Sequence, residues 1–374
     1  MSVLIQGIMD VTFKQIIMWV VGAVLIYLAI EKEFEPALLL PMGFGAILVN
    51  FPKTGVLDQV VNGTQVGGIL DFLFNSGIAT ELFPLLIFIG IGAMIDFGPL
   101  LQNPFMLLFG AAAQFGIFFT ICAAGLIGGF DIRQAASIGI IGAADGPTSI
   151  FVTSQLAYDL LGPVTIAAYS YMALVPIIQP FAIRLVTTEK ERRIRMKYKA
   201  ESVSKLTKIL FPIIITIIAG LIAPISLPLI GFLMFGNLLR ECGVLDRLSN
   251  TAQNELVNIV TILLGITIAT KMTADGFLQL KTLLIIAFGL VAFIFDTIGG
   301  VLFAKVINLF RKEKINPMIG AAGISAFPMS ARVIQKMAQK EDPQNFVLMY
   351  AVGANVAGQI ASVIAGGLLL AYFA

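Results

Sequence analysis

Two short stretches of this sequence place polar residues and helix breakers inside otherwise apolar segments. The first is residues 142–149, Gly-Ala-Ala-Asp-Gly-Pro-Thr-Ser, and the second is residues 316–330, which hold two prolines. Proline removes a backbone donor and clashes with the preceding turn, so each stretch should break a helix. Lipid cannot satisfy the freed backbone groups, so such breaks persist at membrane depth only inside protein or beside a cavity. They restrict the chain to a small class of membrane folds.

The two breaks align with each other. Shifted by 181 positions, residues 142–149 and 323–330 share the pattern Gly-x-x-x-x-Pro-x-Ser, and the sequence Gly-Val-Leu-Asp of residues 55–58 recurs at 243–246. Matching breaks in two halves are typical of ion-coupled transporters built from inverted repeats. The sequence therefore predicts a first repeat at 1–186, a basic linker at 187–208 and a second repeat at 209–374.

Composition supports a polytopic membrane protein. Hydrophobic residues make up 58% of the chain and charged residues 12%, with a mean hydropathy of +0.95. A membrane helix needs about 20 apolar residues, fewer if it is short or tilted in a bundle. We expect an all-α protein with two broken-helix hairpins, near 134–156 and 316–335, and about ten spans. The expected spans are 16–31, 36–51, 83–95, 104–128, 163–184, 209–225, 227–241, 256–270, 282–308 and 346–373.

Charge predicts the orientation. Five spans and one hairpin per half give an odd number of crossings, so the halves should be inverted. Nine Lys and Arg residues lie from Arg184 to Lys208, which indicates a cytoplasmic linker by the positive-inside rule and places both termini outside. A solvated charge run explains this segment equally well, so we assign it no partner. The net charge of +2 indicates no nucleic-acid partner.

Asp145 is the leading candidate for chemistry. A carboxylate at mid-membrane depth costs roughly 2.5–3.5 kcal/mol, so it needs a cation, a proton or a basic partner. A structural ion pair is one explanation. The hydroxyl of Ser149 and the carbonyls freed by the break favour an oxygen site for Na⁺ or H⁺ instead. The second break has Ala326 at the matching position, so the site has one carboxylate and suits a monovalent ion.

Other polar residues add to this site. Asn316 precedes a proline, so its backbone should be extended and its amide oxygen could point inward; the alternative is a helix N-cap. Ser325 could instead bond its own helix. Asn355 and Gln359 lie one turn apart, and interhelical hydrogen bonding is their default explanation. Tyr171 lies mid-span, where its hydroxyl needs a partner and could donate a proton.

Several classes of chemistry are excluded. The chain has no His, so the usual general base is absent. No Walker-type loop occurs, which excludes ATP as the energy source through this chain. Asp96, Asp275 and Asp296 fall nearer span ends or loops and receive no role, Asp296 being the least settled of the three.

Three motifs resemble those of a known family, the beta subunits of the biotin-dependent, sodium-pumping decarboxylases of oxaloacetate, methylmalonyl-CoA and glutaconyl-CoA. They are residues 140–151 (Ile-Ile-Gly-Ala-Ala-Asp-Gly-Pro-Thr-Ser-Ile-Phe), residues 316–332 and residues 353–358. The third departs from the family at Ala354, where the family has Pro. The resemblance covers nearly the whole chain.

The resemblance implies a mechanism. This chain would decarboxylate carboxybiotin held by a partner biotin carrier and export Na⁺ across the cell membrane, consuming a proton. Its fold would be elevator-like, with a mobile core against a scaffold. A carboxyltransferase alpha subunit, a small gamma-type subunit and further copies of the chain would complete the complex. By motif, Na⁺ would be surrounded by Asp145, Asn316, Ser325 and Asn355. Tyr171 would serve the proton or Na⁺ pathway, and Arg332, with Ser325, would meet the biotin carboxylate.

Two other functions remain open from the residues alone. A secondary sodium-coupled carboxylate transporter would use the same breaks, with Arg332 binding a diffusing substrate. A non-catalytic membrane scaffold gains nothing from a mid-membrane Asp145. The substrate of the whole complex is set on another subunit, although the short chain leans toward an acyl-CoA decarboxylase.

Overall fold

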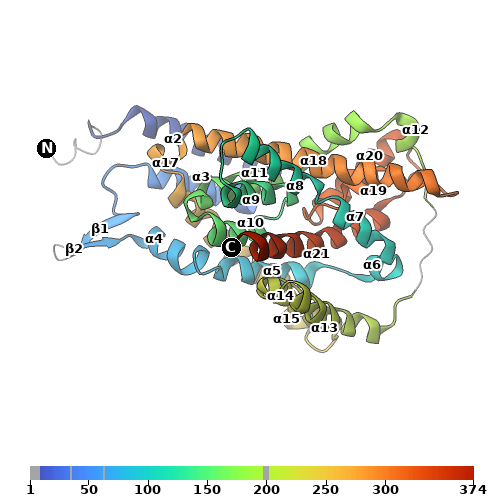
Figure 1. The fold of residues 1–374 in the computed structure, drawn as a ribbon. Helices are drawn as coiled ribbons and strands as arrows, with labels where there is room; N and C mark the ends of the chain where they lie inside the picture. Colours follow the sequence, from blue (N-terminus) through green and yellow to red (C-terminus); the bar gives the residue numbers. More distant parts are fainter. Residues whose placement is uncertain (1–8, 34–35, 62–63, 197–201) are drawn as a thin grey trace.

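The computed structural model describes residues 9–33, 36–61, 64–196 and 202–374, and nearly all of its regular structure is helical (Figure 1). The first half contains α2 (Phe13–Glu31), α3 (Pro36–Val49), β1 (Asp58–Val61), β2 (Thr64–Gly67), α4 (Ile69–Leu73), the π turn η1 (Phe74–Ile78), α5 (Leu82–Met94), α6 (Gly98–Gln102), the 3₁₀ turn η2 (Pro104–Met106), α7 (Leu107–Ala112), α8 (Phe115–Leu126), α9 (Ile132–Gly139), the 3₁₀ turn η3 (Ile140–Ala143), α10 (Gly146–Leu156), the 3₁₀ turn η4 (Tyr158–Leu160) and α11 (Leu161–Val186).

The second half repeats much of this order. It contains α12 (Glu189–Arg192), α13 (Lys205–Ile222), the 3₁₀ turn η5 (Pro224–Ser226), α14 (Leu227–Glu241), α15 (Asp246–Thr251), the π turn η6 (Ala252–Leu256), α16 (Val257–Ile268), the 3₁₀ turn η7 (Ala269–Lys271), α17 (Ala274–Phe277), α18 (Leu280–Phe310), α19 (Met318–Ala321), α20 (Met329–Glu341) and α21 (Leu348–Phe373).

The repeat extends to local backbone. Each half has a short helix, a π turn and a longer helix in succession, α4–η1–α5 and α15–η6–α16. The recurring Gly-Val-Leu-Asp motif begins in both halves with a left-handed glycine, at φ +70° for Gly55 and +69° for Gly243. Both halves also end with a break followed by a long helix, α11 or α21. The inverted relation of the halves and their predicted boundaries remain predictions.

Within the described residues, seven helical stretches are long and apolar enough to cross a membrane, which confirms the all-α, multi-pass prediction. The predicted number of ten counts three helices that are shorter than a full crossing, because α3, α5 and α14 have 14, 13 and 15 residues. In addition, α5 bends by 58° from α4–η1. Before this bend, residues 58–61 and 64–67 form the antiparallel hairpin β1–β2.

The halves interlock through short helices. Helix α3 of the first half packs on α16 of the second half, and α14 of the second half packs on α5 of the first half. Small residues allow the closest approach between membrane helices. A Cβ added to Gly92 would overlap the carbonyl of Leu233, and one added to Gly236 would overlap the carbonyl of Ile89. The α5–α14 contact is therefore a backbone-to-backbone contact.

We predict that Gly236→Ala destabilises the protein by about 1–3 kcal/mol, the usual cost of overpacking a tight contact. The matched control is Gly231→Ala on the same helix, because a Cβ there meets nothing within 4 Å. Thermal unfolding in detergent measures both. Equal melting temperatures for the two variants would show that the α5–α14 contact can open at no cost.

The described part of the linker is docked on the second half. Arg192 Nε lies 2.8 Å from Glu341 Oε1, and Arg195 bonds both carboxylate oxygens of Asp342, at 2.5 and 2.9 Å. A bidentate pair of this kind has a fixed geometry. The hydrogen bonds from Arg195 hold the pKa of Asp342 below its ordinary value. A purely solvated charge run is therefore an incomplete description of this segment.

Asp342→Asn should loosen the linker at neutral pH, since it removes the charge that Arg195 binds. Surface ion pairs are weak, so we expect an increase of about two- to fivefold in the rate of proteolytic cleavage near residue 195. Because the pKa of Asp342 is lowered, the docking is present above the ordinary pKa of Asp and is lost as pH falls through the lowered value. Glu189→Gln, which breaks only the pair inside the linker with Arg193, should leave cleavage unchanged.

Candidate functional site

The first break contains one residue with left-handed backbone, Ala144. After α9 and η3, Ala144 has φ +53°, and Asp145 returns to extended backbone as the N-cap of α10. Asp145 Oδ1 accepts the N–H of Thr148 at 3.2 Å, and Oδ2 accepts the Thr148 hydroxyl at 2.7 Å. Pro147 fits the first turn of α10 because that turn needs no donor there. The sequence thus fixes Asp145, which is only 4% exposed, at a buried helix end.

The second break meets the first directly. The chain leaves α19 at Ala321, runs without regular helix and enters α20 at Met329. Within this segment the N–H of Ser325 donates to the carbonyl of Ala143 at 2.9 Å. This backbone hydrogen bond joins the two broken segments, whose matching positions differ by 181 in the sequence.

Helix α21 contacts both breaks with one face. The Ser362 hydroxyl donates to Asp145 Oδ2 at 2.9 Å, and the Ser325 hydroxyl donates to the carbonyl of Gly358, one turn earlier, also at 2.9 Å. Positions three and four apart share a helix face. Helix α21 runs through the middle of the molecule, beside α10 (Figure 1). The carboxylate and the second break are therefore held on one helix.

Two carboxamides of α21 complete this arrangement. Asn355 Nδ2 donates to the carbonyl of Ile324 at 2.7 Å, and Gln359 Nε2 donates to the carbonyl of Ser325. Their amide nitrogens thus satisfy the carbonyls that the second break leaves without a helical partner. We call this cluster the junction: Asp145, Ser325, Asn355, Gln359 and Ser362.

Buried amide oxygens collect around the junction. The Oδ1 of Asn355 and the Oε1 of Gln359 have no hydrogen-bond partner among the described residues. The same holds for Gln114 and Gln179, whose amide nitrogens donate to the carbonyls of Gly323 and Ala321. Buried acceptors normally have partners. This surplus of oxygen ligands beside one carboxylate fits a hard cation.

The structure brings Asp145, Ser325 and Asn355 together, with Ser149 directly behind the carboxylate. Ser149 donates its hydroxyl to the backbone carbonyl of Asp145 at 2.8 Å. Arg332 lies in the first turn of α20 with an exposed side chain, and it forms no ion pair with the described residues. Its guanidinium is therefore available to an anion from outside the junction.

Asn316 is not in the junction. Its Nδ2 donates to the linker carbonyls of Arg192 at 2.8 Å and Ile194 at 2.9 Å, while its Oδ1 accepts the N–H of Met318 at 3.1 Å. The last of these bonds closes a turn over two residues, whereas the N-cap of α19 is Pro317. The carboxamide therefore points to the linker in this conformation, away from the predicted cation site.

Tyr171 also lies apart from the junction. Its hydroxyl donates to the carbonyl of Ile286, and its ring lies against Gly289 of α18. Tyr169, two positions earlier and so on nearly the opposite side of α11, packs its ring on Gly146, the neighbour of Asp145. Its buried hydroxyl has no partner among the described residues. The predicted span 163–184 holds both Tyr residues. The prediction names Tyr171, and the structure places Tyr169 beside the carboxylate of Asp145.

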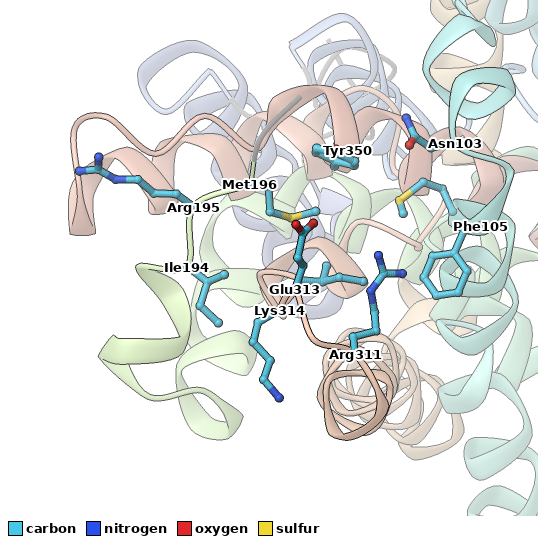
Figure 2. A pocket seen from close by; sticks show the side chains of 11 residues that line it. Asn103, Phe105, Ile194, Arg195, Met196, Arg311, Glu313, Lys314 and Tyr350 are labelled. Carbon is cyan, nitrogen blue, oxygen red and sulfur yellow. The ribbon is translucent and has the colours of Figure 1, made fainter. Parts of the chain in front are cut away.

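A cavity of about 430 Å³ opens where the linker meets the second half, beside α21 (Figure 2). Its lining holds three basic residues, Arg195, Arg311 and Lys314, and one acidic residue, Glu313, and Arg311 lies over the ring of Phe105 at 5.2 Å. Ile315, next to Asn316 in the chain, also lines the cavity. The lining residues do not include those of the junction, so the cavity and the junction are separate features of the structure.

Comparison with known proteins identifies the family. Residues 14–373 match the family described as the Na⁺-transporting oxaloacetate decarboxylase beta subunit. The chain belongs to this family. It is 50% identical over 384 residues to the methylmalonyl-CoA decarboxylase subunit beta of Propionigenium modestum, covering 98% of this chain and 97% of the relative. The oxaloacetate decarboxylase beta chain of Haemophilus ducreyi is 46% identical over 422 residues, covering 98% and 97%, and that of Klebsiella pneumoniae is 45% identical over 428 residues, covering 100% and 98%.

This membership confirms the resemblance drawn from the three motifs. The chain is a multi-pass membrane subunit of a sodium-translocating decarboxylase. The secondary transporter and the non-catalytic scaffold are therefore not supported. The roles of the individual residues remain predictions, and the junction is where most of them gather.

Ser362→Ala should weaken the response of this decarboxylase to Na⁺. It removes one of two hydroxyls that orient Asp145 Oδ2, and a hydrogen bond to a charged group contributes about 1.5–3 kcal/mol. We expect the Na⁺ concentration for half-maximal decarboxylation to rise about tenfold or more. Ser226→Ala is the control, because within the described chain that buried hydroxyl bonds only the carbonyl of Ala223, in its own turn. An unchanged Na⁺ dependence for Ser362→Ala would show that the Ser362 hydroxyl does not orient Asp145 for cation binding.

Proposed function

We propose that this chain couples the decarboxylation of carboxybiotin, carried by a partner subunit, to the export of Na⁺, with one proton consumed in the reaction. The observation that carries this proposal is the junction. It places the buried carboxylate of Asp145 where two broken segments meet, among amide oxygens that have no hydrogen-bond donor among the described residues. Membership of the sodium-transporting family supports Na⁺ as the ion.

The proposed ion ligands are Asp145, Ser325, Asn355 and Ser149. Asp145 supplies the charge, and Asn355 has an oxygen to contribute without losing its hydrogen bond to the second break. A site with one carboxylate suits a monovalent ion, since divalent sites usually gather more charge. For Asn316 to join, its carboxamide has to leave the linker carbonyls, so we assign its contribution to a different position of the second break.

Arg332 is proposed to bind the carboxylate of carboxybiotin. Arg332 lies in the first turn of α20, immediately after the second break, and its exposed guanidinium forms no ion pair with the described residues. An anion bound to Arg332 would therefore move together with the segment that carries Ser325. Arginine binds carboxylates in a planar, bidentate geometry. Tyr171 is proposed for the proton or Na⁺ pathway from the other side of α11. A biotin carrier, a carboxyltransferase alpha subunit and a small gamma-type subunit are the proposed partners, in a complex that holds several copies of this chain.

The substrate of the complex is proposed to be an acyl-CoA. The methylmalonyl-CoA relative aligns over 384 positions, against 422 and 428 for the two oxaloacetate relatives, so the latter carry insertions that this chain lacks. Purification of the complex followed by decarboxylation assays with each substrate decides this assignment.

Asp145→Asn should abolish both Na⁺ transport and decarboxylation of carboxybiotin, while carboxyl transfer onto biotin stays intact. A pump must not decarboxylate without moving ions, so a ligand that serves both steps enforces their coupling. The amide is nearly isosteric and should fold. The measurements are ²²Na⁺ uptake into proteoliposomes and the decay of carboxybiotin.

Asp159→Asn is the matched control for loss of one carboxylate. Asp159 is exposed and pairs with Lys281 at 3.2 Å, outside the junction, so its variant should pump normally. If the Asp145 variant assembles and decarboxylates carboxybiotin at the wild-type rate, Asp145 is structural and the proposed function loses its central residue.

A further inference from the structure

A second buried carboxyl group lies against the first break. Asp296, in the middle of α18, is fully buried. Its Oδ1 accepts the N–H of Ile117 at 3.1 Å, whereas its Oδ2 has no hydrogen-bond partner among the described residues. This free oxygen faces Gly142, where an added Cβ would lie 2.5 Å from it. Asp296 therefore contacts the same broken segment that carries Asp145.

The two oxygens of Asp296 have opposite surroundings. Ile117 is the third residue of α8, so Oδ1 caps the beginning of that helix, where the helix dipole favours a negative charge. Oδ2 lies in an apolar setting, where an unpaired charge is strongly disfavoured. The surroundings of Oδ1 thus favour the ionised form of the carboxyl, and those of Oδ2 favour the protonated form.

Few titratable groups surround this carboxyl. The elements packed against α18 are α7, α8, α9, η3, α11 and α19. The titratable or charged groups that they carry are Cys122, Arg133, Tyr169, Tyr171 and Arg184. Cys122, Arg133 and Arg184 are exposed, and Tyr171 donates to the carbonyl of Ile286, ten positions before Asp296. None of these groups forms an ion pair or hydrogen bond with Asp296, so no fixed charge neutralises it.

The space beside Oδ2 suits a proton better than a metal ion. An added Cβ on Gly142 would also lie 2.9 Å from the Cβ of Ala292, so the backbone of the break sits directly on the carboxyl. A metal ion needs several oxygen ligands around it. A proton needs only the oxygen itself.

We infer that Asp296 is a proton-binding site of the pump, loaded while the first break is seated on α18 and unloaded when that break moves away. On loading, a hydronium ion gives its proton to Oδ2, so one of its O–H bonds breaks, an O–H bond forms at Oδ2 and the carboxyl becomes neutral. On unloading, the bond at Oδ2 breaks and the proton passes through water admitted beside Gly142 to carboxybiotin, where an N–H bond replaces the broken N–C bond and CO₂ leaves. Because Gly142 and Asp145 belong to one segment, the same movement alters the cation site and the proton site. This inference rests on the proposed function and assigns a residue to its proton.

The test uses the reconstituted complex in proteoliposomes, beginning with wild-type turnover. A wild-type complex without Na⁺-coupled decarboxylation of carboxybiotin would overturn the proposed function and this inference together. Asp296→Asn mimics the protonated carboxyl and keeps the oxygen that caps α8. We expect ²²Na⁺ binding to be retained, while proton uptake and decarboxylation fall by about 100-fold or more, as for a lost proton-transfer group.

Asp296→Glu separates a proton-binding role from a capping role. A proton site predicts that Glu, which titrates, works better than the isosteric Asn, whereas a cap predicts the reverse. Thr297→Val is the control for a buried polar change on the same turn, because its hydroxyl bonds the carbonyl of Phe293 in its own helix and no other group of the described residues. Wild-type pumping and proton uptake by Asp296→Asn would overturn the inference. If the Asn protein does not assemble, the Glu protein decides: a shifted pH profile of turnover supports the proton site, and an unchanged profile overturns it.

Discussion

The fold depends on backbone groups that lipid cannot satisfy. Each broken segment exposes carbonyls and N–H groups that a continuous helix would have paired internally. The structure solves this by placing the segments against each other, with Ser325 donating to Ala143. Carboxamides on α21 then take the remaining carbonyls of the second break. The junction is thus first a solution to a hydrogen-bonding problem, and the carboxylate of Asp145 is held within that solution.

Helix α18 supports both breaks from the opposite side. Asp296 lies on Gly142 of the first break, and Gly300 meets Gly320 of α19 so closely that a Cβ on either would overlap the other's carbonyl. Positions 296 and 300 are one turn apart and share a face. The two breaks are therefore packed between α21 and α18, and neither can move without disturbing contacts with both helices.

Much of this arrangement could be predicted from the sequence because prolines and a lone carboxylate in apolar segments have few explanations. The breaks, the multi-pass helical class and the joining of Asp145, Ser325 and Asn355 follow from residue chemistry and from the resemblance. The direction of Asn316 could not be predicted, since it depends on where the carbonyls of the linker dock. The choice between Tyr169 and Tyr171 depends on which neighbour covers each side of α11. Two further sequence signals point to features of the structure. The carboxamides of Gln114 and Gln179 lie in the middle of apolar spans, which indicates polar partners at that depth. The pair Asn62-Gly63 is typical of hairpin turns and falls between the sequences of β1 and β2.

The docked linker gives the second break a mechanical connection to the surface. The carbonyl of Arg192 accepts hydrogen bonds from both Asn316, at the entrance to the break, and Asn345, in the turn after α20, while its guanidinium pairs with Glu341. The segment that joins the halves is thereby fastened to both ends of the α19–α20 unit. A displacement of the α19–α20 unit therefore also displaces the linker, unless these hydrogen bonds and the ion pair break. The position of the second break is in this way coupled to the position of a surface segment.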